Sequence, residues 1–156
     1  MILKDSFIIE APIDDVWALL QDVHRVSTCV PGVDSIEEIG PNMYNGVLKV
    51  KVGPISSSFQ GEVTLTEQTY PPGRLVAEVS GKDKISASQV KAIFTGLLIA
   101  IEGGTQLDYE MDVALRGRLA QFGLVVVKAT AKKMTAEFVK RFTELLAEQD
   151  KSGQVE

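Results

Sequence analysis

Cys29 and His24 are the side chains best suited to covalent chemistry, and they are the only cysteine and the only histidine of the 156-residue chain. A catalytic cysteine needs a nearby base to form its thiolate, and a helical turn between the two residues would bring that base close. No acidic residue is placed to orient the histidine, and unreactive cysteines commonly fill protein cores. We therefore interpret Cys29 as a packing residue, with Pro31 ending a helix and Gly32 turning the chain into a strand. We predict no catalytic residue, metal site or cofactor.

Three carboxylates, Asp108, Glu110 and Asp112, alternate along one segment and are candidates for acid-base chemistry. Their spacing puts all three on one face of a strand. Because the other face is apolar, we expect the carboxylates to lie in water, away from the interior. The turns at 53–54 and 103–104 lack the lysine-serine pair and the following helix that a phosphate-binding loop requires. We predict no nucleotide site.

The composition indicates one acidic globular domain. Hydrophobic residues make up 45% of the chain, the formal net charge is -5 and the pI is near 5.0. This charge argues against nucleic-acid binding, which needs a basic surface. The longest apolar run, 92–101, is about half of the roughly 20 residues that cross a bilayer as a helix, and the first residues lack a secretory pattern. We expect a domain over residues 1–149, a disordered tail over 150–156 and a cytoplasmic location.

The period of the apolar residues changes from strand to helix along the chain. An apolar stretch at 7–9 precedes Pro12, which stands at a helix start, and a second short helix follows. Residues 33–116 have period two and form about six strands, and residues 119–149 return to a helical period. The expected strand turns are at Gly40, Gly53, Pro71 and Glu102. This order predicts an α+β fold in which a curved antiparallel sheet of about seven strands wraps around a long C-terminal helix.

We predict a space between this sheet and the long helix, because a twisted sheet touches a helix at its rims. Inward strand positions hold few large aromatic residues and several small ones, such as Gly46, Gly61 and Ala77, and the helix adds Gly123 and Ala129. The expected lining residues are Trp17, Leu48, Val50, Phe59, Val63, Leu75, Ala77, Leu107, Tyr109, Met111, Val113, Phe122, Val126, Thr130 and Met134.

Two surfaces are candidates for contact with partners. The long helix carries five basic residues over 128–141 against the single acid Glu137. They form either the solvated back of an amphipathic helix or a face for anionic lipid or an acidic partner enzyme. These residues are Lys128, Lys132, Lys133, Lys140 and Arg141. The run 92–101 is apolar on both faces, so its outer face is expected to be covered by another protomer, in a homodimer, or by the partner enzyme.

Three stretches resemble one known family. They are APIDDVWALLQDVHRVSTCVPGV near the start, VKVGPISSSFQGEV in the middle and LRGRLAQFG at the opening of the last helix. Together with the order of elements they resemble the carbon monoxide dehydrogenase G-subunit family of the START-like, or Bet v 1-like (SRPBCC), superfamily, over about residues 2–148. The resemblance implies the helix-grip fold of that superfamily.

Members of that family are accessory proteins of molybdenum-containing carbon monoxide dehydrogenases, implicated in recruiting the enzyme to the membrane and in binding hydrophobic ligands such as quinones. The resemblance implies a non-catalytic carrier of a lipid or quinone, partnered with a molybdenum hydroxylase and peripheral at the inner face of the cell membrane. Some members end in a hydrophobic anchor, whereas this sequence ends in a polar stretch, so we expect transient membrane contact. Two alternatives remain: a docking or assembly factor with a filled core, and a START-like cyclase or hydrolase, for which His24 and Tyr109 are the available groups.

Overall fold

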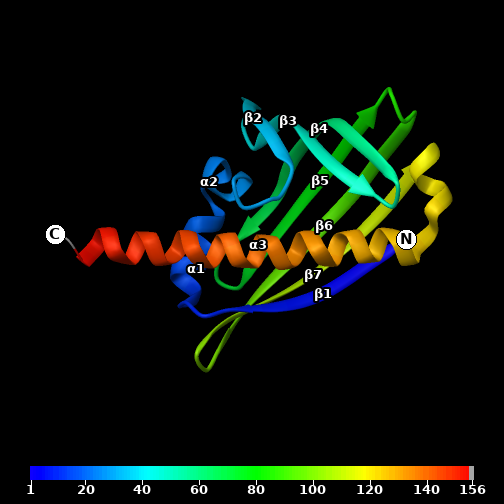
Figure 1. Ribbon diagram of the computed structural model, residues 1–156. Helices are drawn as coiled ribbons and strands as arrows, with labels where there is room; N and C mark the ends of the chain where they lie inside the picture. The colour runs from blue at the N-terminus through cyan, green and yellow to red at the C-terminus, as the bar shows by residue number, and fades with distance from the viewer. Residues whose placement is uncertain (155–156) are drawn as a thin grey trace.

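A seven-stranded antiparallel sheet curves over a long helix in the computed structural model of the chain (Figure 1). The structure describes the backbone of residues 1–154 and the side chains of residues 1–149. Its strands are β1 (Ile2–Ile9), β2 (Val33–Gly40), β3 (Met43–Val52), β4 (Ile55–Thr69), β5 (Gly73–Asp83), β6 (Ser88–Ile101) and β7 (Gly104–Arg116). Its helices are α1 (Ile13–Leu20), α2 (Val23–Ser27), the short 3₁₀-helix η1 (Arg118–Phe122) and α3 (Gly123–Gln154). This order confirms the predicted α+β helix-grip fold.

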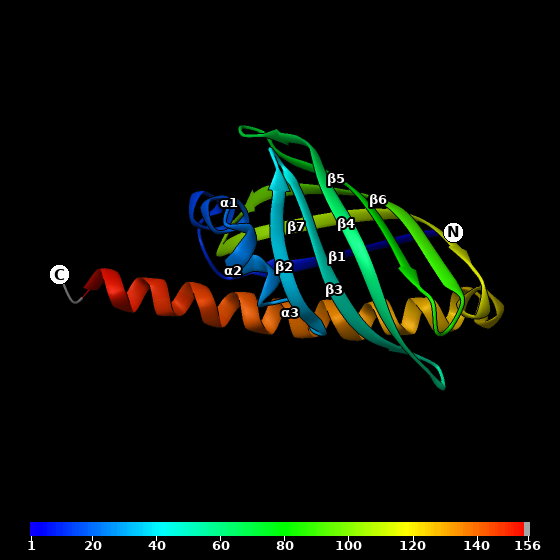
Figure 2. The same cartoon turned by 90° about the horizontal axis from the view of Figure 1, so that it is seen from above.

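The two edges of the sheet are strands that follow each other in the chain. The strand order is β1-β7-β6-β5-β4-β3-β2, and β1 pairs antiparallel with β7. Consequently α1 and α2 connect one edge of the sheet to the other. Figure 2 shows α3 running along the concave face of the sheet, with α1 and α2 gathered at one end of it. The interior of the domain therefore lies between that face and α3.

Glycines aligned across neighbouring strands permit the curvature. Gly46 of β3 pairs with Gly61 of β4, which pairs with Gly81 of β5. A Cβ atom on Gly46 would lie 2.3 Å from the carbonyl oxygen of Ser35, and one on Gly61 would lie 2.7 Å from that of Ser80. Only glycine allows so close an approach of the next strand. The room expected beside these glycines is therefore taken by backbone, and their effect on the interior comes through the bend of the sheet.

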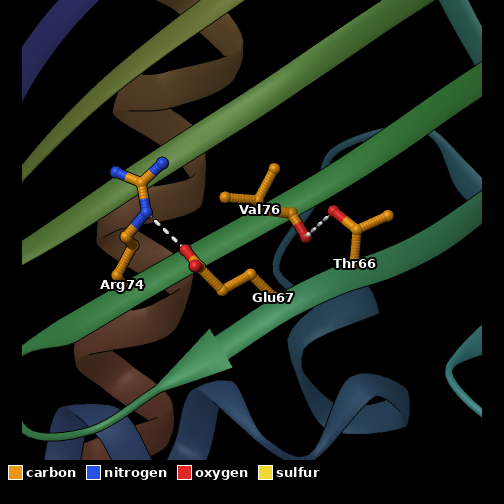
Figure 3. A network of polar contacts seen from close by, with 4 residues as sticks. All are labelled: Thr66, Glu67, Arg74 and Val76. Carbon is orange, nitrogen blue, oxygen red and sulfur yellow. Dashed lines mark hydrogen bonds and ion pairs between the residues drawn. The ribbon is translucent and has the colours of Figure 1, made fainter.

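A bulge in β4 adds to the bend. The pairing of β4 with β5 shifts between Leu65 and Glu67, which leaves Thr66 as the extra residue. Its hydroxyl donates a hydrogen bond of 3.3 Å to the carbonyl oxygen of Val76, and beside it Glu67 and Arg74 form an ion pair across the two strands (Figure 3). These polar contacts hold the bulge on the outer face of the sheet, with α3 behind it.

The turn after α2 differs in one detail from the prediction. The helix ends at Ser27, and the amides of Thr28 and Cys29 then bond to carbonyl groups three residues back. The helix thus tightens into a turn before it reaches Pro31. Gly32 has the predicted role, since its φ is +90° and a Cβ atom there would lie 2.0 Å from the carbonyl oxygen of Lys49.

The long helix also begins and ends differently from the expected 119–149. Residues 118–122 form η1, and α3 begins at the next residue, Gly123, whose φ is +74°. Helix α3 then continues to Gln154, so residues 150–154 of the expected tail are helical backbone, and 155–156 lie outside the described residues. Within the described part of the chain, no helix combines the length and the apolar character needed to cross a bilayer.

Candidate ligand-binding interior

The buried core is divided into three clusters. The first joins β1, α1, α2, β6, β7 and α3 around Phe142, which is fully buried. The second joins Leu3, Ala92 and Val113 on β1, β6 and β7. The third, formed by Val52, Phe59 and Leu119, lies where η1 meets β3 and β4. The β1-β7-β6 side of the interior and its two ends are therefore filled.

The predicted lining residues lie on the same faces as the buried core, with different degrees of burial. Phe59, Ala77, Leu107 and Val113 are buried. The half-buried residues are Trp17, Leu48, Val50, Val63, Leu75, Tyr109, Met111, Phe122, Val126, Thr130 and Met134. Trp17 lies at the α1 end, where it packs against the first cluster and stacks on Tyr70 with ring centroids 5.2 Å apart. Gly123 and Ala129, expected to leave room on the helix side, are instead exposed.

Six of the predicted lining residues belong to none of the three clusters in the part of the chain whose side chains are described. They are Leu48, Val63, Leu75, Ala77, Thr130 and Met134. The sheet residues of this set come from β3, β4 and β5, and Thr130 and Met134 come from α3. All except Ala77 are half-buried. Because these side chains point inward and still remain partly exposed, the rest of the protein does not cover them completely. We call this set the apolar wall.

An aromatic row borders the apolar wall and ties the sheet to α3. Phe94 stacks on Tyr109 with centroids 5.7 Å apart, and Phe7 bridges Tyr109 and Phe138 at 6.4 and 6.2 Å. The Thr135 hydroxyl donates to the Ala131 carbonyl oxygen, so the Tyr109 hydroxyl, 2.9 Å away, donates to Thr135. This pair is a polar group at the edge of an apolar surface.

Phe94, Phe7 and Thr135 also belong to the inner surface, although their sequence pattern did not predict it. Strand β6 is apolar on both faces, so its period does not reveal that Phe94 points inward. Thr135 resembles any other polar helix residue in the sequence. Thr130 and Met134 are four residues apart and so mark the inward face of α3, and Thr135 follows Met134 directly. This spacing was the sequence signal that could have identified Thr135.

Cys29 is part of the first cluster and is 1% exposed. Burial raises the pKa of its thiol, against the opposing effect of a hydrogen bond from Thr28 and of the charges of Arg141 and Arg25. The sulfur lies 3.7 Å from the carbonyl oxygen of Arg25. Cys29 therefore packs in the core, as the sequence predicts. A raised pKa also lowers the fraction of thiolate, the form of cysteine that attacks.

The alternating carboxylates lie on the outer face, as expected. Asp108 accepts hydrogen bonds from Ser6 and Gln106, at 2.6 and 2.8 Å, which hold its pKa below the usual value. Glu110 pairs with Lys4 at 3.3 Å. No cluster of three histidine, cysteine or carboxylate side chains suited to a metal ion occurs among the described residues.

Two depressions, of about 570 and 530 Å³, lie on the outer face of the sheet. Gln60, Lys82 and Gln89 line the first, and Glu78, Ile93 and Asp112 line the second. Because these side chains point away from α3, the depressions do not test the predicted interior. Both are open to solvent, with polar and apolar surface in similar amounts, and we assign them no ligand.

The predicted contact faces are exposed. Lys128, Lys132, Lys133 and Lys140 lie on the solvent side of α3. Arg141 differs, because it pairs with Glu137 at 2.9 Å and donates to the Thr28 carbonyl oxygen at 3.4 Å, which ties α3 to α2. The outer face of β6 exposes large apolar side chains, namely Ile93, Leu97 and Ile99.

A model of one protein family matches most of the chain. The family is described as the G subunit of carbon monoxide dehydrogenase (CoxG), and the match covers residues 6–147. All three stretches that carry the resemblance in the sequence lie within this range. A search of curated proteins gave no match.

Solved structures share the fold at low sequence identity. A conserved protein from Geobacillus kaustophilus superimposes with a TM-score of 0.86 at 23% identity, covering 95% of this chain and 96% of that one. A START superfamily protein from Mycobacterium smegmatis gives 0.70 at 10% identity, over 95% and 98% of the two chains. The Zhui aromatase/cyclase from Streptomyces sp. R1128 gives 0.66 at 15% identity, over 94% and 93%. At these identities the likeness establishes the fold alone. With the family match over 6–147, the chain belongs to the carbon monoxide dehydrogenase G-subunit (CoxG) family and has the START-like helix-grip fold.

Proposed function

We propose that this protein is a non-catalytic carrier that binds a hydrophobic molecule, a lipid or a quinone, between its sheet and α3. The observation that carries the proposal is the apolar wall, whose mostly half-buried side chains lie between sheet and helix without joining the filled core. A ligand covering it would gain about 25 cal/mol for each Å² of apolar surface removed from water. Leu48, Leu75 and Met134 would be among the first contacts.

The border of the apolar wall supports a ligand with a polar end. The Tyr109 hydroxyl and Thr135 form a hydrogen bond at that border. A carbonyl or hydroxyl group of the ligand would compete for the same hydrogen bond, while its chain covers the aliphatic side chains. A prenylated quinone or an acyl lipid has this combination of groups.

Family membership supports the second part of the proposal. The protein would serve a molybdenum-containing hydroxylase of the carbon monoxide dehydrogenase type and help to recruit it to the membrane. The exposed lysines of α3 are available for anionic headgroups or for an acidic patch of the enzyme, and each such residue near a charged membrane adds about 1 kcal/mol.

Native mass spectrometry of protein purified from its own host, followed by organic extraction, tests the carrier. We expect a stoichiometric lipid or quinone that leaves the protein in organic solvent. As a matched variant, Tyr109→Phe keeps the apolar wall and removes only the hydroxyl, so it should still bind the ligand's apolar chain but retain less ligand than the native protein, because the hydrogen bond to the polar end is lost. Repeated recovery of protein without ligand would instead favour a docking factor with a filled core.

A further inference from the structure

Two exposed apolar segments project from one end of the molecule. Both views place the β3–β4 turn, the β5–β6 turn and η1 with the start of α3 at this end, opposite α1 and α2 (Figures 1 and 2). Ile85 in the β5–β6 turn is 90% exposed, and Leu124 and Val125 in the first turn of α3 are 47% and 82% exposed. We call these three residues the apolar tip. Such large apolar side chains held out at adjoining segments mark an interaction surface.

A buried polar network holds the β5–β6 turn in shape. The carboxylate of Asp83 accepts hydrogen bonds from the amides of Ser58 and Ile85, at 3.1 and 3.0 Å, and from the hydroxyl of Ser86 at 2.9 Å. The Ser86 hydroxyl in turn lies 3.3 Å from that of Ser57 on β4. Ile85 is therefore presented outward by a hydrogen-bonded turn and not by a loose loop.

The same turn is fastened to the segment that carries Leu124 and Val125. The amide of Leu119 in η1 donates to the Ser88 hydroxyl at 3.3 Å. Gly117 lies so close that a Cβ atom there would be 1.8 Å from the carbonyl oxygen of Ala87. Since these contacts join the β5–β6 turn to η1, which leads directly into α3, the members of the apolar tip are held at the same end of the domain.

Positive charge surrounds the apolar tip although the chain is acidic overall. The segments 39–61, 84–101 and 113–136 contain no aspartate or glutamate. Their basic residues are Lys49, Lys51, Lys84, Lys91, Arg116, Arg118, Lys128, Lys132 and Lys133. Of these, Lys49 forms an ion pair with Asp34 at 3.5 Å and adds no free charge. The carboxylate that precedes the turn, Asp83, is buried and bound by its own network. At the opposite end, α1 and the approach to α2 carry Asp14, Asp15 and Asp22.

We propose that this end docks on an anionic lipid membrane. Ile85, Leu124 and Val125 enter the apolar layer beneath the headgroups, and the exposed cations beside them, Lys84, Arg118 and Lys128, bind the lipid phosphates. Apolar protrusions ringed by cations complement an anionic surface laid over hydrocarbon. The inference deepens the membrane contact of the proposed function and rests on it: it places the contact at the end of the domain and adds insertion to the attraction of the α3 lysines.

Sedimentation with vesicles tests the docking end. The vesicles are phosphatidylcholine alone and phosphatidylcholine with phosphatidylglycerol. Ile85→Ser with Val125→Ser should bind the anionic vesicles about tenfold more weakly than the native protein, because two apolar side chains no longer leave water. Both positions are largely exposed, so folding should be unaffected. The matched control, Ile8→Ser with Ile99→Ser, removes two exposed apolar side chains from the outer face of the sheet and should bind as the native protein does.

The outcomes separate this inference from the proposed function. If Lys132→Glu with Lys133→Glu abolishes vesicle binding while the Ile85 and Val125 variant binds normally, the docking end is wrong and the α3 face is the membrane contact. If the native protein does not bind anionic vesicles, both membrane proposals are wrong. The carrier proposal is then still tested by extraction of the bound ligand. If Ile85→Ser with Val125→Ser no longer binds a purified molybdenum hydroxylase but still binds vesicles, the apolar tip is a protein interface and the inference is overturned.

Discussion

At the scale of residues, Asp83 shows how one side chain can build a turn without glycine or proline. The β5–β6 connection, 84–87, was not among the turns expected from the sequence, because its residues are Lys, Ile, Ser and Ala. The carboxylate supplies the missing geometry through its bonds to Ile85 and Ser86, and Ala87 adopts a φ of +50°. Aspartate and serine side chains at this spacing form turns through local hydrogen bonds, so they were the sequence signal for a turn at 84–87.

The ionisation of Asp83 should make this turn sensitive to acid. Burial favours the neutral acid, but the hydrogen bonds from Ser86, Ser58 and Ile85 outweigh it and lower the pKa of Asp83 below its usual value. Its stabilising contribution is therefore complete above the unfolded-state pKa of about 3.9 and is lost as the pH falls through the folded value. The native protein should have a higher urea midpoint than Asp83→Asn at neutral pH, and the gap should narrow as the pH falls below the unfolded-state pKa.

The control for this prediction is Glu62→Gln, an exposed change on the outer face. Its urea midpoint should follow that of the native protein through the same pH range. A gap between native and Asp83→Asn protein that stays constant with pH would contradict an ionised, hydrogen-bonded carboxylate.

At the scale of elements, the shape of the sheet depends on a few positions where strands approach closely. Gly46 is the clearest case, because the backbone of β2 occupies the place of its missing Cβ atom. The position of α3 depends on a different contact. Arg141 pairs with Glu137 and donates to the Thr28 carbonyl oxygen, which fixes the C-terminal half of α3 against α2. Curvature and helix position together set the distance between the two layers.

Gly46→Ala should destabilise the protein strongly. The added methyl group would lie 2.3 Å from the carbonyl oxygen of Ser35, so β2 must move away from β3. We expect a loss of about 2 kcal/mol or more in the free energy of unfolding, measured by urea denaturation. Gly40→Ala is the matched control, since a Cβ atom there meets only Met43 at ordinary distance. Equal stability of the two variants would show that the sheet does not need the glycine.

At the scale of the whole molecule, the question is whether the apolar wall borders open volume or a tightly packed core. The filled clusters lie on the β1-β7-β6 side and at the two ends, and the apolar wall lies on the β3-β4-β5 side. A carrier needs that volume, whereas a docking factor can do without it.

Leu75→Trp distinguishes the two cases. Beside open volume the indole is accommodated, so the free energy of unfolding should change by less than about 1 kcal/mol while the extracted ligand is lost; in a packed core, overfilling should cost about 1–3 kcal/mol. Ala92→Leu, at a buried position of the second cluster, is the positive control for overfilling. Urea unfolding and ligand extraction of the three proteins give the answer. If Leu75→Trp loses as much free energy of unfolding as the overfilling control, the interior beside Leu75 is packed and the open interior is contradicted.

Much of the fold follows from local patterns. The alternation in β3 and β7 assigns the two faces of the sheet. Pro12, followed by Asp14 and Asp15 in the first helical turn, predicts the start of α1. Family motifs add the rest, because the quoted stretches mark the α1–α2 region, the β3–β4 hairpin and the entry to α3. These features are readable because each depends on neighbours a few positions away.

What the sequence by itself determined is the order of the elements, the inward face of most strands and the packing role of Cys29. What only the tertiary structure decided is the fate of residues with the same local pattern. Leu48 and Leu107 both alternate with polar neighbours on a strand, yet Leu107 is buried in the first cluster and Leu48 stays half exposed on the apolar wall. Their burial depends on how far α3 stands from each part of a curved sheet, and that distance arises from contacts between residues far apart in the chain.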